Sequence, residues 1–290
     1  MSATTLMPAA FIGHGSPMNT LESNRYTAAW QALGRSLPLP RAVLAISAHW
    51  YTNGSAVTAM RQPRVIHDFY GFPRELFEFD YPAPGSPEVA QEIANVLRPN
   101  YVGLDQDSWG LDHGTWSVLA HVFPKANVPV VQLSIHAGEE IGYHFELGER
   151  LAALRERGVF ILGSGNVVHN LRRIDWSHPD GAYDWGVRFD AEVKRMMTSA
   201  PKDILAISAH PDYALAVPTP EHFLPLPYLA GLCHQAGEPA EVLIEGGTMG
   251  SLTMTSYLLG CQGLPHPVAG HGPAAALPDS IIVPPENSNT

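Results

Sequence analysis

Hydrophobic residues along this chain follow two alternating patterns. Short, nearly continuous apolar runs predict buried strands, and longer segments with apolar residues on one helical face predict amphipathic helices. The predicted strands span residues 9–13, 42–48, 56–60, 128–135, 159–163 and 241–245. The predicted helices span residues 26–37, 87–97, 115–123, 144–157, 185–198 and 223–235. This alternation is typical of an α/β fold, so we expect a single domain with a central, largely buried mixed sheet flanked by helices.

Three of the predicted strands lead to a histidine. His14 follows the first strand, His49 follows the second, and His169 lies a few residues beyond the fifth. Ligands of open α/β sheets bind beyond the carboxyl ends of strands. Because imidazole both binds transition metals and transfers protons near neutral pH, the three histidines predict a metal site or an acid–base site there. The alternative is that each histidine merely ends a turn.

Two further histidines lie near predicted helix starts. His113 lies in a loop flanked by glycines, just before the helix 115–123. His222 lies in the first turn of a helix that we expect to begin at Pro220, with Thr219 as its N-cap. Because adjacent residues on a helix point about 100° apart, we expect only one of Glu221 and His222 to bind a given metal ion.

The residues are compatible with two kinds of metal site. Ligation by histidines alone with one open position fits Zn(II), whereas two histidines and a carboxylate fit non-haem Fe(II). The sequence contains no HExxH helix, Walker loop, GxSxG elbow or CxxC pair, which excludes several other common catalytic sites.

Composition narrows the partners. The formal net charge is -11, and only 17 of the 290 residues are Lys or Arg. Nucleic acids and anionic membranes attract clustered positive charge, so neither is an expected partner. No apolar run approaches the roughly 20 residues of a membrane-spanning helix, and the first residues lack a signal-peptide pattern. Two cysteines do not make a disulfide framework. We therefore expect a cytoplasmic protein with a small-molecule substrate.

The end of the chain differs in composition from the rest. Residues 263–290 are rich in Pro, Gly, Ala and Asn, with one apolar cluster at 281–283. We expect a catalytic domain over residues 1–262 and an extended tail over 263–290, packed on the domain through that cluster. The pentapeptide AISAH at 45–49 recurs at 206–210, but nothing around it repeats, so we treat His210 as a bystander.

Nine motifs occur in an order that resembles a known family. They are GHGSP at 13–17, SAHW at 47–50, HDFYGFP at 67–73, YPAPGSP at 81–87, LDHGTW at 111–116, VQLSI at 131–135, SGNVVHNLR at 164–172, TPEHFLPL at 219–226 and MGSLTM at 249–254. The chain thereby resembles the 4,5-DOPA extradiol dioxygenase-like enzymes, within the class III extradiol dioxygenases related to the catalytic subunit of protocatechuate 4,5-dioxygenase. The resemblance covers about residues 8 to 260.

The resemblance implies a role for each candidate residue. His14, His49 and His222 match the metal ligands, although a glutamate in the protocatechuate branch keeps Glu221 as an alternative to His222. His169 matches the acid–base histidine, which in some zinc-loaded members is close enough to be a fourth ligand. His113 matches a second catalytic histidine of the active site. One divalent metal per chain is implied, with Fe(II) expected for dioxygenase activity and Zn(II) as an alternative bound ion.

The implied reaction is the opening of a small aromatic diol, DOPA-like in kind, by O₂ at a mononuclear metal. Aromatic residues of the motifs are candidates for the lining of a substrate slot, namely Trp50, Phe69, Tyr70 and Phe72. Two alternatives remain from the residues themselves. One is a zinc-dependent hydrolase on the same scaffold, and the other is a metal-binding protein without catalysis, which would have no use for both His113 and His169.

Overall fold

The computed structural model describes residues 6–261 and 272–277. At its centre is an eight-stranded sheet with the order β4-β3-β5-β2-β6-β1-β10-β7. Its strands are β1 (Ala9–Gly13), β2 (Ala42–Thr52), β3 (Ala56–Thr58), β4 (Gly103–Asp105), β5 (Val130–His136), β6 (Val159–Gly165), β7 (Glu241–Ile244) and β10 (Ser256–Leu259). Strands β5, β2, β6 and β1 run parallel, whereas β3 and β10 run antiparallel to their central neighbours. The sheet is therefore mixed, as predicted.

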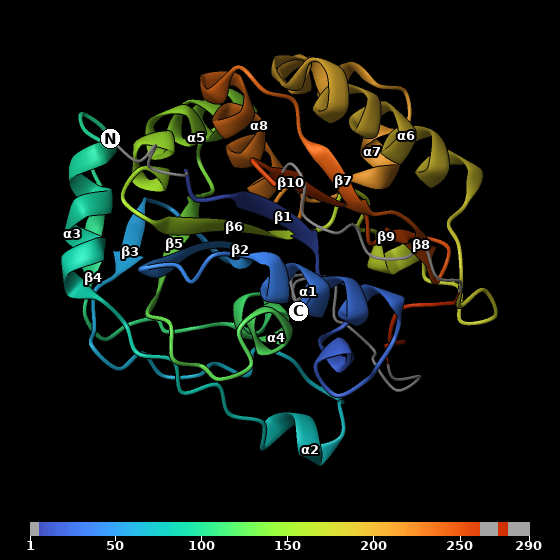
Figure 1. Ribbon diagram of the computed structural model, residues 1–290. Helices are drawn as coiled ribbons and strands as arrows, with labels where there is room; N and C mark the ends of the chain where they lie inside the picture. Colours follow the sequence, from blue (N-terminus) through green and yellow to red (C-terminus); the bar gives the residue numbers. More distant parts are fainter. Residues whose placement is uncertain (1–5, 262–271, 278–290) are drawn as a thin grey trace.

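Helices cover both faces of the sheet (Figure 1). One face packs against α3 (Pro87–Val96), α5 (Ile141–Arg155), α6 (Asp184–Ser199) and α8 (Pro225–Ala236). The other packs against α1 (Arg25–Ser36) and α4 (His113–Val122). Side chains along β2 alternate between these layers, with Leu44 and Ile46 on the α5–α8 side and Val43 and Ala45 on the α1–α4 side. A strand buried on both faces must be apolar at every position, which explains its continuous hydrophobic run.

The remaining elements are short. They are α2 (Arg74–Phe77), α7 (Tyr213–Ala216), the β8 (Gly247–Thr248) and β9 (Leu252–Thr253) hairpin, and the 3-10 helices η1 (Pro17–Thr20), η2 (Leu171–Arg173) and η3 (Pro201–Ala209). The second AISAH copy lies at the end of η3 and not in a strand. The same five letters therefore take two structures, because the first copy is enclosed between β5 and β6.

Every predicted strand and helix is confirmed, with ends that shift by a few residues. The sequence pattern predicts neither β4 and β10 nor the two-residue strands β8 and β9. β4 is only three residues long, and β10, although fully buried, has four residues at the end of the domain. Runs this short give little periodic signal.

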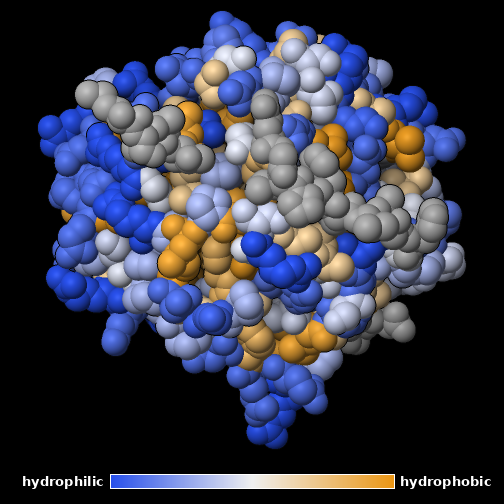
Figure 2. All heavy atoms as spheres, in the orientation of Figure 1, coloured by the Kyte–Doolittle hydropathy of each residue, from blue (hydrophilic) through white to orange (hydrophobic). Residues whose placement is uncertain are grey.

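The surface of the molecule is mainly polar on the face drawn in Figure 2. Hydrophilic residues cover most of that face, and hydrophobic residues gather in a few areas. In the described ranges, none of the helices is long and apolar enough for a membrane crossing.

The predicted domain boundary at 262 and the apolar cluster at 281–283 lie outside the described residues. Of the predicted tail, residues 272–277 are described, and their backbone bonds to Ser16, Asn19 and Arg25.

Candidate metal centre

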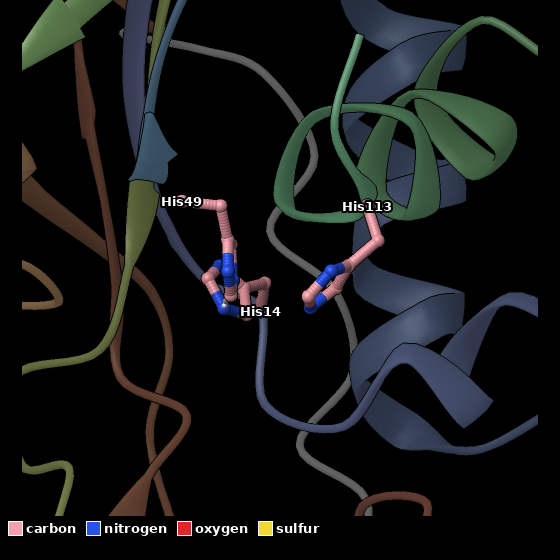
Figure 3. A group of neighbouring side chains, drawn as sticks. All are labelled: His14, His49 and His113. Atoms are coloured by element: carbon pink, nitrogen blue, oxygen red, sulfur yellow. Dashed lines mark hydrogen bonds between the residues drawn. The ribbon is translucent and has the colours of Figure 1, made fainter. Parts of the chain in front are cut away.

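Three histidines from distant parts of the chain point toward one another at one end of the sheet (Figure 3). His14 directly follows β1, His49 belongs to β2, and His113 begins α4. The Nε2 atoms of His14 and His49 are 3.3 Å apart, and the ring centroids of His49 and His113 are 3.8 Å apart. One nitrogen of each histidine lies within 4.8 Å of the other two, so this group can hold a metal ion.

His49 reaches the cluster through an irregularity in β2. The strand extends to Thr52, so the expectation that it ends at Ala48 is wrong. Its pairing with β6 ends at Ser47, and its register with β5 shifts between Ile46 and Tyr51. Such a break in the ladder re-aims a side chain without ending the strand. His49 occupies this break.

His113 is held by the capping of α4. The Asp112 side chain accepts a hydrogen bond from the backbone N–H of Thr115 at 3.1 Å and makes His113 the first residue of the helix. The helix therefore begins two residues earlier than predicted. Asp112 is fully buried and also bonds to the side-chain amide of Gln132. This anchored cap fixes the direction in which the His113 side chain leaves the helix.

His169 and His222 form a second group with Glu221. The two imidazole rings are stacked, with centroids 3.5 Å apart and planes 4° apart. The ring centroid of His222 lies 5.4 Å from that of His14 and 5.1 Å from that of His49. All five histidines selected from the sequence therefore lie in one cluster.

The predicted helix start at Pro220 is wrong. α8 begins at Pro225, and His222 lies in a turn before it. The Thr219 hydroxyl does not cap a helix but donates to the Glu221 carboxylate at 2.7 Å. The turn packs closely on the end of β6, because a Cβ atom on Gly165 would lie 2.1 Å from the carbonyl oxygen of His222. Glycine is required there for that close approach.

Each of three histidines has an acceptor beside its Nδ1 atom. His14 Nδ1 is 2.9 Å from Ser164 Oγ, and because that hydroxyl donates to the Gly114 carbonyl at 2.5 Å, it can only accept from the ring. His222 Nδ1 is 3.2 Å from Glu221 Oε1, and His49 Nδ1 is 3.3 Å from Asp68 Oδ2. Protons on the three Nδ1 atoms leave the Nε2 lone pairs free.

This donor pattern fits a bound cation. Two unprotonated Nε2 atoms, those of His14 and His49, face each other at 3.3 Å with no proton available between them, and their lone pairs repel without a positive charge. Metal-binding histidines usually donate their second nitrogen to a carboxylate, a hydroxyl or a carbonyl. The Nδ1 atoms of His14 and His222 lie within hydrogen-bond distance of such an acceptor, and that of His49 lies within ion-pair distance. Glu221, which the sequence left as an alternative ligand, lies beside His222 Nδ1 and orients that ring.

Burial keeps the imidazoles of His14, His49, His169 and His222 neutral. It lowers the pKa values of His14, His49 and His169 well below 6.5, and the neighbouring histidines lower them further. Burial likewise lowers the pKa of His222 to about 3. Neutral imidazole is the form that binds metals and accepts protons, so these histidines can do both at neutral pH.

Sequence reasoning missed Asp68, although it belongs to the HDFYGFP motif. The sequence predicts a role only for the aromatic residues of that motif. Among these, Phe69 is buried with its ring in edge contact with His113, whereas Tyr70 is 74% exposed and forms no buried wall. Trp50 stacks on Trp109. An acidic residue next to a histidine in a loop with no periodicity gives no signal of its own.

Comparison with known proteins decides the family. Residues 9–260 match the family described as the catalytic LigB subunit of aromatic ring-opening dioxygenase. The chain belongs to this family. It is 47% identical to the 4,5-DOPA dioxygenase extradiol of Escherichia coli K12 over 262 residues, covering 89% of this chain and 96% of that protein. It is 35% identical to the protein of the same name from Beta vulgaris, covering 85% and 94%.

A solved structure agrees with this membership. The crystal structure of an uncharacterized protein from Escherichia coli K12 matches with a TM-score of 0.77 and 44% identity, covering 87% of this chain and 99% of that one. The prediction of an extradiol ring-opening dioxygenase is confirmed by the family and the relatives. The comparisons give no support to the hydrolase alternative.

Proposed function

We propose that this LigB family member opens the ring of a small DOPA-like catechol with O₂, using one Fe(II) ion held by His14, His49 and His222. The substrate class is supported by four relatives that are named 4,5-DOPA dioxygenase extradiol and share 47%, 35%, 32% and 31% identity with this chain. The observation on which the proposal most depends is the pair of Nε2 atoms 3.3 Å apart, each with its Nδ1 beside an acceptor.

The proposed residues have two roles, metal ligand and general base. His14, His49 and His222 would hold the metal through Nε2. Bound Fe(II) would supply the redox chemistry by which a catechol reacts with O₂. His169 makes no side-chain hydrogen bond in the described part of the chain and is only partly buried, so its ring is available to an incoming substrate. It would accept a proton from a catechol hydroxyl as general base.

His113 has a different role in this proposal. Its Nδ1 is 2.9 Å from Asp68 Oδ1, which leaves Nε2 on the open side of the ring. There it would contact the substrate or the oxygen atoms that develop negative charge. His113 also lies within ligand distance of His14 and His49. Replacing His113 with Ala distinguishes a catalytic role from a ligand role. Loss of a ligand releases the metal, whereas loss of a catalytic histidine does not.

The decisive experiment is anaerobic reconstitution with Fe(II), followed by oxygen-electrode assays with DOPA, catechol, protocatechuate and caffeate. We expect O₂ uptake with DOPA and the coloured semialdehyde of extradiol cleavage. The zinc-loaded protein is the metal control and should take up no O₂. His210→Ala is the matched histidine control, because His210 lies outside the cluster and should not affect turnover. One bound iron per chain without O₂ uptake on any of the four catechols contradicts the proposal.

A further inference from the structure

Asp68 lies between two histidines of the cluster and serves both with different oxygen atoms. Its Oδ1 accepts two hydrogen bonds from His113, one from the backbone N–H at 3.1 Å and one from Nδ1 at 2.9 Å. Its Oδ2 is 3.3 Å from Nδ1 of His49. One carboxylate therefore connects the start of α4 to β2.

His49 has no alternative partner on that side. Its buried Nδ1 makes no aligned hydrogen bond to any protein group in the described residues, and Asp68 Oδ2 is the acceptor within ion-pair distance. The other ring nitrogen of His49 faces Nε2 of His14. Which nitrogen of His49 carries the proton thus depends on the carboxylate, since nothing else in contact with Nδ1 selects a tautomer.

Asp68 has one oxygen for each histidine. Oδ1 lies 2.9 Å from Nδ1 of His113, and Oδ2 lies 3.3 Å from Nδ1 of His49. A carboxylate oxygen accepts, so each oxygen favours a proton on the Nδ1 atom that it faces. The carboxylate thus lies on the Nδ1 side of both rings.

We propose that Asp68 is the positioning residue of the centre: it keeps His49 in the Nδ1–H tautomer, with Nε2 free for the metal, and fixes the His113 ring beside it. The second part of the cluster has its own counterpart in Glu221, which contacts Nδ1 of His222. The proposal depends on the proposed function only for naming His49 as a metal ligand.

Asp68→Asn tests the role of one oxygen at a time. The backbone N–H of His113 can only donate, so the amide oxygen must take the place of Oδ1. The amide NH₂ then takes the place of Oδ2 and donates to Nδ1 of His49. This forces the proton of His49 onto Nε2, where it faces His14 and blocks a metal. His113 keeps its acceptor and should keep its tautomer.

The primary measurement is the tautomeric state of the histidines, from long-range ¹H–¹⁵N spectra of the chelator-treated protein. In the unmodified chain, His49 should show Nδ1–H. In Asp68→Asn it should show Nε2–H, while His113 remains Nδ1–H. The second measurement is Zn²⁺ affinity by competition with a chromophoric chelator, where we expect a loss of about 10- to 100-fold. Asp80→Asn is the matched control, because Asp80 is an exposed carboxylate on the same connection, and it should change neither readout.

The outcomes separate this inference from the proposed function. An Nε2–H tautomer for His49 in the unmodified chain, or unchanged Zn²⁺ affinity in Asp68→Asn, overturns the role of Asp68. Should Asp68→Asn fail to fold, the spectrum of the unmodified chain still decides the tautomer. A tautomer switch and a loss of Zn²⁺ affinity support the inference even if the iron-loaded protein takes up no O₂, in which case only the proposed function fails.

Discussion

Ser164 fixes the ring of His14 from the neighbouring strand. Its hydroxyl accepts from His14 Nδ1 at 2.9 Å and donates to the carbonyl of Gly114 at 2.5 Å, so the three groups form a single chain of hydrogen bonds. These hydrogen bonds connect β6, the residue after β1 and the first turn of α4. A hydroxyl engaged in this way cannot reverse its direction, and His14 is held with Nε2 unprotonated.

Replacing Ser164 with Ala should therefore weaken metal binding. We expect a loss of about 10- to 100-fold in Zn²⁺ affinity, because partners of metal-binding histidines contribute at that level. Ser134→Ala is the matched control. Ser134 is also buried and also makes two hydrogen bonds, to Ala56 and Gly54, but outside the cluster. Both variants should lose thermal stability, and only Ser164→Ala should lose affinity; equal affinities would contradict this role.

Alanine variants of the two stacked histidines should separate a base from a ligand. If His169 is the base, His169→Ala should retain most of its bound iron and lose about 10²- to 10⁴-fold in kcat. His222→Ala should lose the iron itself. Metal content by elemental analysis and O₂ uptake are measured on the same samples. Loss of iron from His169→Ala would instead make His169 a fourth ligand.

The histidines could be selected from the sequence because they lie next to elements that hydrophobic periodicity predicts. His14 comes directly after a continuous apolar run, and so does His49. The residues that contact the Nδ1 atoms of these histidines could not be selected in this way. Asp68 comes from an aperiodic loop, and the role of Ser164 depends on the position of Gly114, fifty residues away in the sequence. Long-range pairing of this kind follows from the sheet order and is not encoded in local spacing.

The same limit applies to His222. Motif order predicts that His222 is a ligand, whereas local capping rules predict that it lies in a helix, and that helix begins only at Pro225. Thr219 and Pro220 are good helix-starting residues, yet the turn is set by its contact with Gly165 at the end of β6. Tertiary packing therefore gives a turn at His222, although the local sequence favours a helix there.

Acid should destabilise the metal-free protein below pH 6.5. The pKa values of His14, His49, His169 and His222 are lowered in the folded state, mainly by burial. Between the unfolded pKa near 6.5 and the lower folded values, the unfolded chain binds more protons, so stability falls as the pH falls. Each such group contributes up to about 1.4 kcal/mol per pH unit.

Two carboxyl groups oppose this trend over part of the range. Burial raises the pKa values of Asp112 and Asp190 to about 6, so from pH 6 to about 4 the folded state binds more protons at these sites. The four histidines, together with His121 and His144, whose pKa values burial also lowers, outweigh the two aspartates, and the net direction remains destabilising. Urea midpoints of the metal-free protein at pH 7.5, 6.0 and 5.0 measure it. A midpoint that rises or stays constant from 6.0 to 5.0 would contradict the neutral state of the cluster.

The segment 272–277 should stabilise the loop that presents His14. Ser16 Oγ donates to the Ala276 carbonyl at 3.1 Å, and the Ala275 N–H donates to Asn19 Oδ1 at 3.0 Å. Asn19 in turn donates through its side-chain nitrogen to the carbonyl of His14 at 3.0 Å. Ala274 and Ala275 are buried in this contact. A chain shortened after residue 271 should therefore lose thermal stability and hold Zn²⁺ less tightly, because Asn19 loses one of the partners that fix it.

A chain shortened after residue 277 is the matched control, since it keeps all of these hydrogen bonds. Thermal melting and chelator competition are compared for the full chain and both shortened chains. We expect the chain ending at 277 to behave like the full chain and the chain ending at 271 to show a lower Tm, because each buried hydrogen bond contributes about 1 kcal/mol. If both shortened chains match the full chain, the contact with Ser16 and Asn19 has no role in holding His14. If both lose the same Zn²⁺ affinity, the effect belongs to residues after 277 and not to this segment.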